Sequence, residues 1–285
     1  MKSLLITLEY PPFFGGVANY YSNIVNYWPE KNGLDVLDNQ GGFLVSERLP
    51  FLKWLPSLWN ILRTVQKEGH DHIMVGQVLP LGIPALVASR LTGAKYSVIL
   101  HGMDYTFANK YLKKRYIARL VLNNAVQIIC SNSHLAMQIK KDLGATISKK
   151  ISVVNPGIGP APQVNQAIVM SLRSKYGLSG KKILFTVGRL VKRKGQDFVI
   201  SAIPSISRKE KDFVYVIAGA GPDEAYLKKL AEILGDDDRS KIIFVGKISD
   251  EEKWAWLSLC DAFIMPSRNI DGDFEGFGIV YLEAN

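Results

Sequence analysis

The stretch Lys182-Ile-Leu-Phe-Thr-Val-Gly-Arg-Leu-Val-Lys-Arg-Lys-Gly195 contains an apolar run, a basic loop and the approach to a helix. The apolar run Lys182–Val187 predicts a strand, and the apolar spacing of residues 196–206 predicts a helix. Strand, loop and helix in this order form the repeating unit of parallel sheets. Ligands of such sheets bind beyond the carboxyl ends of the strands, so the cations after Val187 are candidate ligand-binding residues.

The same alternation extends over the rest of the chain. Further strands are predicted at residues 4–8, 72–76, 96–100, 126–130, 151–154, 215–218, 242–245 and 262–265. Further helices are predicted from about Val17 and Ser133, and at residues 84–91, 110–122, 223–234 and 250–259. Residues 155–162, Asn-Pro-Gly-Ile-Gly-Pro-Ala-Pro, are dense enough in proline and glycine to be a linker. We therefore predict an α/β chain of two tandem Rossmann-like, doubly wound domains, at residues 1–160 and 161–285.

Composition narrows the class of protein. The 285 residues are 47% hydrophobic and 21% charged, which is typical of a globular protein. No apolar run reaches the roughly 18 residues that a membrane-spanning helix needs. Cys130 and Cys260 lie far apart in apolar contexts, without the spacing of a zinc site or a redox pair, so we expect a cytoplasmic protein.

The net charge of +9 is concentrated in the first half of the chain. Residues 1–150 hold 17 Lys and Arg against nine Asp and Glu, whereas residues 151–285 hold 18 against 17. The densest basic cluster is interleaved with Tyr111 and Tyr116 and consists of Lys110, Lys113, Lys114, Arg115 and Arg119. This pattern suits an anionic membrane surface or a phosphorylated acceptor, and it also suits a solvated helix face. Nucleic acid is disfavoured, because no nucleic-acid motif accompanies the charge.

Two carboxylates near the end of the chain are spaced for a ligand with hydroxyl groups. In Glu275-Gly-Phe-Gly-Ile-Val-Tyr-Leu-Glu283-Ala-Asn285, a glycine turn precedes an apolar run that predicts a helix. Glu275 would lie at the helix N-terminus and Glu283 about two turns along it. Hydroxyl groups near the acids and a phosphate near the first-turn N–H groups describe a sugar nucleotide, although acidic residues also occur at ordinary helix N-termini. Because a helix beginning near Gly278 has barely two turns before Asn285, we expect the second domain to be incomplete.

Cations follow the strand Lys182–Val187. Arg189 lies directly at the strand end and Lys194 precedes the next helix, so both can face one diphosphate without a metal ion. We expect Lys192 and Arg193 to be solvated residues of the same loop. A basic loop without any ligand is the alternative.

Three other strand ends carry weaker signals. His101-Gly-Met-Asp104 follows an apolar strand. Its histidine can form a hydrogen bond to a ligand, or it can have a purely structural role. Gly15-Gly16-Val17 opens a helix, where glycine lets backbone N–H groups approach a phosphate or simply turns the chain. Ala218-Gly-Ala-Gly-Pro222 allows either close approach to a ligand or a reversal of the chain.

Two segments bear on the base and on metal ions. Gly246, Lys247 and Ile248 follow a strand and can present backbone groups to a nucleobase. Asp271-Gly-Asp273 has the spacing of a metal-binding Asp-x-Asp pair, but we expect it to be the loop that leads to Glu275. We therefore predict no metal site and no cofactor.

Together these motifs resemble the retaining glycosyltransferases of family four, also called glycosyl transferases group 1, which have the GT-B fold. The resemblance covers essentially the whole chain, from Pro11-Pro12 and Gly15-Gly16-Val17 to the two glutamates that are eight residues apart. The segment from Asp271 to Ala284 is most similar to bacterial mannosyltransferases that act on phosphatidylinositol mannosides.

The resemblance implies a role for each motif. The second domain would bind a nucleotide-activated hexose, GDP-mannose or a UDP-sugar, and the first domain a glycan or lipid-linked acceptor. Arg189 and Lys194 would bind the diphosphate, Glu275 the hexose hydroxyls and Glu283 the ribose. Backbone N–H groups would hold the sugar and phosphate at Phe277, Gly278 and Ile279. Gly16 would let the first loop close on the diphosphate, and His101 would contact the transferred sugar.

The resemblance also implies retention of the anomeric configuration without a protein nucleophile and without a metal ion. A non-catalytic protein that binds sugar nucleotides or glycans on the same scaffold is the alternative. A nicotinamide-dependent oxidoreductase is disfavoured, because no G-x-G-x-x-G sequence opens the first helix. We expect the heads of Arg189, Lys194, Glu275 and Glu283 to converge on one ligand.

A membrane-linked acceptor would place the enzyme at the inner face of a membrane. Besides the basic cluster, residues 51–59 (Phe-Leu-Lys-Trp-Leu-Pro-Ser-Leu-Trp) have aromatic side chains and a lysine suited to a lipid interface. Ordinary packing of this segment on the first sheet is the alternative.

Overall fold

The chain forms two compact units, Met1–Gly157 and Ile158–Asn285. The structure is a computed structural model that describes residues 2–13, 15–30, 32–46, 52–270 and 275–285. The division falls inside the proline- and glycine-rich stretch that the sequence marks as a linker.

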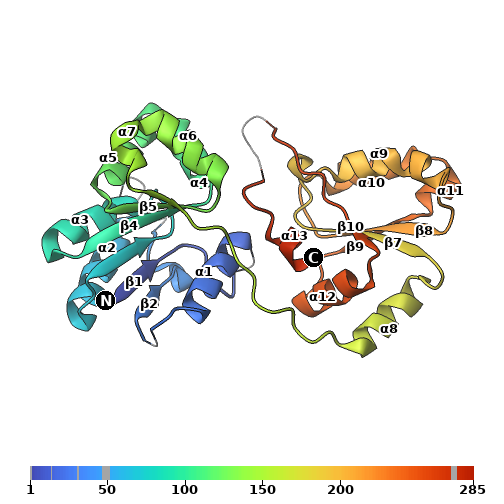
Figure 1. The fold of residues 1–285 in the computed structure, drawn as a ribbon, viewed down its shortest axis with the longest axis horizontal. Helices are drawn as coiled ribbons and strands as arrows, with labels where there is room; N and C mark the ends of the chain where they lie inside the picture. The colour runs from blue at the N-terminus through green and yellow to red at the C-terminus, as the bar shows by residue number, and fades with distance from the viewer. Residues whose placement is uncertain (1, 14, 31, 47–51, 271–274) are drawn as a thin grey trace. The chain divides into compact units, whose positions relative to one another are not determined.

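Unit 1 contains a six-stranded parallel sheet of order β2-β1-β3-β4-β5-β6 (Figure 1). Its strands are β1 (Ser3–Ile6), β2 (Leu34–Leu37), β3 (His72–Val75), β4 (Lys95–Leu100), β5 (Gln127–Cys130) and β6 (Ile151–Val153). Its helices are α1 (Gly16–Asn26), η1 (Gln40–Gly42), α2 (Leu55–Glu68), α3 (Gly82–Thr92), α4 (Met103–Asn109), α5 (Leu112–Asn124), α6 (Ser133–Leu143) and α7 (Ala145–Ser148).

The side chains of β1 alternate between two hydrophobic clusters. Leu4 and Ile6 belong to the larger cluster, which includes buried residues of α2, α3, α5 and α6. Leu5 faces the opposite way, into a smaller cluster with Tyr20 and Tyr21 of α1. Because successive side chains of a strand point to opposite faces, this alternation shows that the sheet is covered on both faces.

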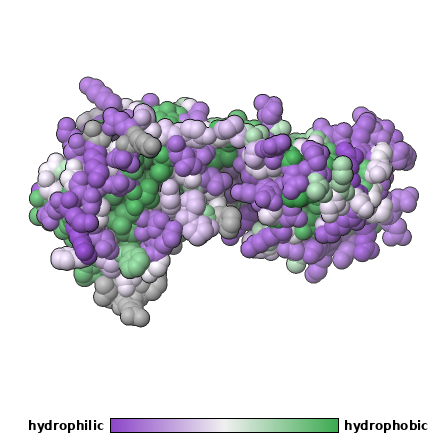
Figure 2. Space-filling model, turned by 90° about the horizontal axis from the view of Figure 1, so that it is seen from below, coloured by the Kyte–Doolittle hydropathy of each residue, from purple (hydrophilic) through white to green (hydrophobic). Residues whose placement is uncertain are grey.

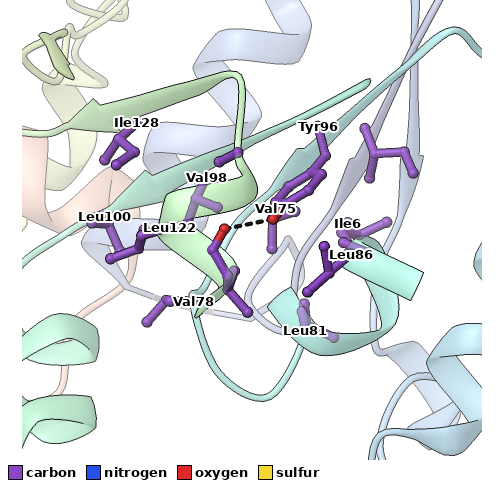
Figure 3. Close-up of a cluster of buried hydrophobic side chains, with 14 of the residues drawn as sticks. Ile6, Val75, Val78, Leu81, Leu86, Tyr96, Val98, Leu100, Leu122 and Ile128 are labelled. Atoms are coloured by element: carbon purple, nitrogen blue, oxygen red, sulfur yellow. Dashed lines mark hydrogen bonds between the residues drawn. The ribbon is translucent and has the colours of Figure 1, made fainter. Parts of the chain in front are cut away.

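In the larger cluster, apolar residues from neighbouring strands and helices pack against each other (Figure 3). The hydroxyl of Tyr96 in this cluster donates to the carbonyl oxygen of Val121 at 2.5 Å. A buried hydroxyl needs such a partner, so this bond lets a large ring occupy the core.

Unit 2 contains a four-stranded parallel sheet of order β10-β7-β8-β9. Its strands are β7 (Lys182–Val187), β8 (Phe213–Ala218), β9 (Ile242–Gly246) and β10 (Ala262–Phe263). Its helices are α8 (Gln166–Lys175), η2 (Lys192–Lys194), α9 (Gln196–Ser207), α10 (Glu224–Glu232), α11 (Asp236–Arg239), α12 (Asp250–Leu259) and α13 (Ile279–Glu283).

The fully buried strand β8 lies between two layers of helices (Figure 1). Phe213, Tyr215 and Ile217 pack in a cluster with residues of α9 and α10. Val214 and Val216 pack in the other cluster, with residues of α8 and α12. Unit 2 is therefore also doubly wound, and the predicted α/β class of both units is confirmed.

Several boundaries differ from the prediction. The helix predicted at 110–122 is α5, and α4 precedes it as a separate helix. Regular pairing of the strand predicted at 262–265 ends at Phe263, although Ile264 N still donates to Phe185 O at 2.8 Å. Glu283 is the last residue of the five-residue helix α13, so its predicted place two turns along a helix is wrong.

Candidate functional site

The loops that follow β7 and β8 contact each other through their backbones. Gly188 N donates to Ala218 O at 3.1 Å. A Cβ atom at Gly219 would lie 1.9 Å from Gly188 O, and one at Gly221 would lie 2.2 Å from Leu190 O. No side chain fits at such distances, so glycine is required at both positions. The backbone that closely approaches the glycine-rich turn is thus that of the loop after β7, and not a ligand.

The turn η2 is held against the loop that follows β10. Gly195 ends η2 with a left-handed φ of 77°, and a Cβ atom there would lie 2.2 Å from Pro266 O. Arg268 N donates to Arg193 O at 2.8 Å. These backbone contacts fix Lys194, the last residue of η2, beside the segment that leads towards Glu275.

Glu275 forms an ion pair with two cations of η2. Its Oε2 lies 2.6 Å from Lys194 Nζ and 2.6 Å from Arg193 Nη1. The side chains are only 11% (Lys194), 18% (Arg193) and 19% (Glu275) exposed, so solvent screens the pair weakly. One carboxylate between two cations leaves a local charge of +1, which suits an anionic ligand with hydroxyl groups.

The structure corrects the predicted roles within this loop. Arg193, which we expected to be solvated, contacts Glu275. Arg189 is exposed, and among the described residues no hydrogen bond or ion pair to its side chain is present. Lys192 is exposed as expected. Of the four heads expected to converge, the structure brings together Lys194 and Glu275.

The helix α13 is anchored to β10 by Tyr281. Its hydroxyl donates to Met265 O, and its ring meets that of Phe263 edge-on at 5.7 Å. Gly278, the N-cap of α13, has a φ of 74°, and a Cβ atom there would lie 2.6 Å from the Tyr281 ring. Glycine thus lets the chain turn sharply between Glu275 and the helix.

Backbone donors lie at this turn. The N–H groups of the first turn of a helix have no acceptor inside the helix. Of residues 277–279, where we predicted donors to the sugar and phosphate, Ile279 is the first residue of α13, Gly278 is its N-cap and Phe277 precedes the cap. Their contact with a ligand stays a prediction.

Glu283 is directed to α12. Its Oε1 lies 2.8 Å from Lys253 Nζ, and its side chain is only 10% exposed. Lys253 also lies 3.4 Å from Asp250 Oδ1. A ribose hydroxyl would have to share Glu283 with this lysine, and the predicted ribose contact stays a prediction.

The segment predicted to meet the base follows β9. Gly246 has a φ of 72°, and its carbonyl oxygen accepts a bond from Gly219 N at 2.7 Å. Lys247 is exposed, and Ile248 packs against the core of unit 2. Side-chain recognition by Ile248 is therefore disfavoured, and a backbone contact with the base stays a prediction.

In unit 1, His101 lies directly after β4 and contacts Tyr21 of α1. The Tyr21 hydroxyl donates to Gly76 O at 2.5 Å, so its oxygen accepts from His101 Nε2–H at 2.7 Å. This fixes the tautomer and leaves Nδ1 as an acceptor. Burial lowers the pKa of His101 to about 4, so the ring is neutral at pH 7.

Asp104 turns the chain after His101. Its Oδ1 accepts from the backbone N–H groups of His101 at 3.1 Å and Gly102 at 3.0 Å. Its Oδ2 is buried without a partner among the described residues. Burial raises the pKa of Asp104 to about 6, and the backbone bonds oppose that rise.

Gly16 is the first residue of α1. No described atom lies within 4 Å of a Cβ atom built there, so the local backbone would accept a side chain. The predicted closure of this loop on a diphosphate therefore stays a prediction, and residue 14 beside it lies outside the described residues.

Other surfaces carry less information about chemistry. A shallow hollow on α2 is lined by Trp59, Leu62, Arg63, Gln66 and Lys67, all from one helix. Within the described ranges, no group of three or more His, Cys, Asp or Glu is placed to hold a metal ion. The Asp-x-Asp sequence at 271–273 lies outside those ranges. No helix of the described chain is long and apolar enough to cross a membrane.

Sequence reasoning missed three residues of these clusters. Tyr21 and Arg193 act through contacts with residues 80 and 82 positions away. Arg268 Nη2 lies 2.6 Å from Asp197 Oδ2, and its guanidinium stacks on Phe198 at 4.1 Å. The spacing of residues along the chain gives no signal for contacts of this kind.

Comparisons with known proteins agree with this architecture. The model of the family "Glycosyl transferases group 1" matches residues 171–285. A Mycobacterium tuberculosis GDP-mannose-dependent alpha-(1-6)-phosphatidylinositol monomannoside mannosyltransferase is 29% identical, over 100% of this chain and 78% of its own length. The corresponding Mycolicibacterium smegmatis protein is 27% identical, over 99% of this chain and 77% of its own.

Solved structures share the fold. Anabaena HepE in complex with UDP matches with a TM-score of 0.73 at 16% identity, over 100% of this chain and 78% of that one. WaaG, a glycosyltransferase involved in lipopolysaccharide biosynthesis, matches with a TM-score of 0.64 at 16% identity, over 99% and 78%. Residues 171–285 are therefore a glycosyl transferases group 1 domain, and the two parallel-sheet units of the chain have the GT-B fold.

Proposed function

We propose that this chain transfers a hexose from a nucleotide sugar, GDP-mannose or a UDP-sugar, to a glycan or lipid-linked acceptor, with retention and without a metal ion. The observation that carries the proposal is the cluster of Lys194, Arg193 and Glu275 beside the carboxyl ends of the unit 2 strands. The mycobacterial relatives, named as GDP-mannose-dependent phosphatidylinositol monomannoside mannosyltransferases, support mannose as the sugar and a glycolipid as the acceptor.

The cluster suits the charge that develops during transfer. Lys194 and Arg189 would bind the diphosphate, and N–H groups of residues 277–279 would add neutral donors. Glu275 would accept hydrogen bonds from the hexose hydroxyls, and Glu283 from the ribose. Fixed donors that face a departing phosphate stabilise the transition state more than the ground state.

The proposed reaction balances without a protein nucleophile. The bond between the anomeric carbon and the phosphate oxygen breaks, and its electron pair leaves with the nucleoside diphosphate. The acceptor oxygen forms the new bond on the same face of the sugar. Its proton passes to the departing phosphate oxygen. The products are a glycosylated acceptor and a nucleoside diphosphate.

Unit 1 would contribute the acceptor site and His101. Because Nε2–H is held by Tyr21, Nδ1 is the atom available to accept a hydrogen bond from a sugar hydroxyl. We infer a cytoplasmic location, at the inner face of the membrane for a lipid-linked acceptor. The two free cysteines, Cys130 and Cys260, support a reducing compartment.

The test is a panel of GDP-, UDP- and ADP-sugars, first by thermal shift and then by transfer to glycan and lipid acceptors. We expect one donor to stabilise the protein and to be consumed. Lys194→Ala and Glu275→Gln should each lower kcat by about 10²–10³-fold, as removal of one transition-state donor does. The NMR anomeric signal of the product tests retention, and activity in EDTA tests metal independence. Donor binding without turnover for any acceptor would instead favour the non-catalytic alternative.

A further inference from the structure

Arg193 is a cation of η2 that makes none of the proposed donor contacts. The face of unit 2 seen in Figure 2 is mainly hydrophilic, and an exposed cation on such a face needs no explanation. The Arg193 side chain, however, is only 18% exposed, whereas its neighbour Lys192 is exposed. Removing a guanidinium from water is costly unless it makes compensating contacts, so the partners of Arg193 indicate its role.

Arg193 is held at its backbone and at its guanidinium. Its carbonyl oxygen accepts from Arg268 N at 2.8 Å, and its Nη1 lies 2.6 Å from Glu275 Oε2. Arg268 is itself fixed, because its guanidinium pairs with Asp197 Oδ2 at 2.6 Å and stacks on the Phe198 ring at 4.1 Å. Arg193 therefore bridges a fixed part of the backbone and the Glu275 carboxylate.

Lys194 approaches the same carboxylate from the end of β7. A Cβ atom built on Gly188, just after β7, would lie 3.9 Å from Lys194 Nζ, and Nζ lies 2.6 Å from Glu275 Oε2. Ligands of parallel sheets bind beyond the carboxyl ends of the strands, so Lys194 is the cation placed to meet a phosphate. Arginine suits the other task, because its planar guanidinium is always charged and loses less conformational freedom per hydrogen bond than lysine does.

The Glu275 carboxylate uses one of its oxygens for these cations. Both contacts are made with Oε2, and within the described residues Oε1 makes no ion pair or hydrogen bond. The stem of the side chain lies against the N-cap of α13, since a Cβ atom at Gly278 would lie 3.4 Å from Glu275 Cγ. Because the side chain is held at its stem and at Oε2, Oε1 keeps a fixed direction as an acceptor for hydroxyl groups.

We propose that Arg193 is a positioning residue, which keeps Glu275 oriented while Lys194 turns to the donor phosphate. Without Arg193, Oε2 would lose both of its described contacts at that moment, and the carboxylate would be free to rotate about its stem. With Arg193 in place, Oε1 still faces the hexose hydroxyls. The inference rests on the proposed function, because it names the residue that orients one of the proposed donor contacts.

The test compares two affinities of each variant by isothermal titration calorimetry of the whole chain. One ligand is a nucleotide sugar and the other is its nucleoside diphosphate, in the pairs GDP-mannose with GDP and UDP-glucose with UDP. The readout is the preference for the nucleotide sugar, which is the ratio of the two dissociation constants and measures the contribution of the hexose. A cation that merely attracts the diphosphate acts on both ligands, so its removal should not lower this preference.

Three variants separate positioning from charge. Arg193→Gln should lower the preference about tenfold, because a hydrogen bond between the hexose and an oriented, charged acceptor is lost. Arg193→Lys keeps the charge and can make the single contact with Oε2, so it should restore the preference to within about threefold of the parent value. Arg193→Gln combined with Glu275→Gln should have the same preference as Glu275→Gln alone, since both substitutions act through one carboxylate.

Lys192→Gln is the matched control. It removes a cation from the same turn, but the Lys192 side chain is exposed, and the described contacts of Glu275 are made with Arg193 and Lys194. The preference of this variant should equal that of the parent chain. Urea unfolding of each variant checks that the chain is folded under the conditions of the titration.

Four results would overturn the inference. One is an unchanged preference in Arg193→Gln, including an equal loss of affinity for both ligands, as a purely structural role predicts. Another is an Arg193→Lys variant that behaves as Arg193→Gln does. The third is a double variant with a lower preference than Glu275→Gln alone, and the fourth is an equal loss of preference in Lys192→Gln. If the parent chain binds neither nucleotide sugar, the proposed function fails and this inference fails with it.

Discussion

At the scale of single residues, the carboxylate of Glu275 compensates two cations that are largely removed from water. Glu275→Gln leaves Arg193 and Lys194 without that charge, at side-chain exposures of only 18% and 11%. We expect the free energy of unfolding to fall by about 1–3 kcal/mol, because losing an acid that contacts two weakly hydrated cations is costly. Urea unfolding measures this change.

Glu251→Gln is the matched control for that substitution. Glu251 is exposed on α12, so its replacement should change the stability by less than about 0.5 kcal/mol. Equal effects of the two substitutions would show that the cluster of Glu275 does not stabilise the fold.

Asp104 gives a pH-dependent prediction. Its folded pKa of about 6 is above its usual value, so its contribution to stability is greatest below about pH 4 and is lost as the pH rises through about 6. Asp104→Asn keeps the shape and does not ionise. The variant should therefore be more stable than the parent at pH 7.5, on the order of 1–3 kcal/mol, with the difference vanishing near pH 4.

The contribution of the neighbouring His101 to stability depends on pH in the opposite direction. Its folded pKa of about 4 is lowered, so its contribution is present above about pH 6.5 and is lost as the pH falls through about 4. Because both proteins contain His101, the difference between them isolates Asp104. Urea titrations between pH 4 and 7.5 measure it, and a variant that is less stable at pH 7.5 would contradict the raised pKa.

The sequence names candidate site residues but does not indicate which of them contact each other. Lys194 and Glu275 were both predicted as site residues, and they form an ion pair. The choice of Arg189 over Arg193 as the second cation was a prediction from position alone. Which cation meets Glu275 depends on the direction of each side chain in a tight turn, and residue order does not encode that direction.

At the scale of elements, the junction of the loops after β7 and β8 depends on atoms of the backbone. Gly219→Ala would place a methyl group 1.9 Å from Gly188 O, at a φ of 132° that disfavours any side chain. We expect a loss of several kcal/mol in the free energy of unfolding, about 3 or more, because a backbone atom cannot move aside as a side chain can.

Gly235→Ala provides the comparison for this junction. No described atom lies within 4 Å of a Cβ atom at Gly235, and its φ of −61° is open to any residue. Its stability should stay within about 0.5 kcal/mol of the parent. If Gly219→Ala were equally tolerated, the two loops would not be held in the contact described above.

The apolar pattern of the sequence predicted many elements, but not the helix α2 (Leu55–Glu68), whose Ile61 and Val65 are buried. The buried strands β4, β7 and β8 follow from continuous apolar runs. The missed strand β2 is a half-buried run of four residues at the sheet edge, Leu34–Leu37, with an aspartate inside it. The missed helix α8 keeps a single residue, Leu172, fully buried, so it lacks the regular apolar stripe that marks a helix.

At the scale of the whole molecule, the link between the two units is a predicted site of cleavage. Residues 154–165 lie outside helices and strands, and most of them are exposed. Limited digestion with proteinase K should cut there first, because extended and exposed backbone fits a protease. Mass spectrometry of the products should find ends within this segment. First cuts inside α3 or β8 would contradict the division into two units.

The ion pair between Lys194 and Glu275 also bears on which small molecules the protein accepts. A ligand that binds here must replace the contact between the Lys194 ammonium and the Glu275 carboxylate. Phosphate alone would bind the Lys194 ammonium and would repel the Glu275 carboxylate. A free sugar would donate hydrogen bonds to Glu275 but would not replace its charge beside Lys194. A molecule that carries both a phosphate and sugar hydroxyls supplies a new partner to Lys194 and to Glu275 at the same time. On the proposed function, an intact nucleotide sugar would therefore bind more favourably than phosphate or a free sugar alone, and more favourably than the nucleotide product.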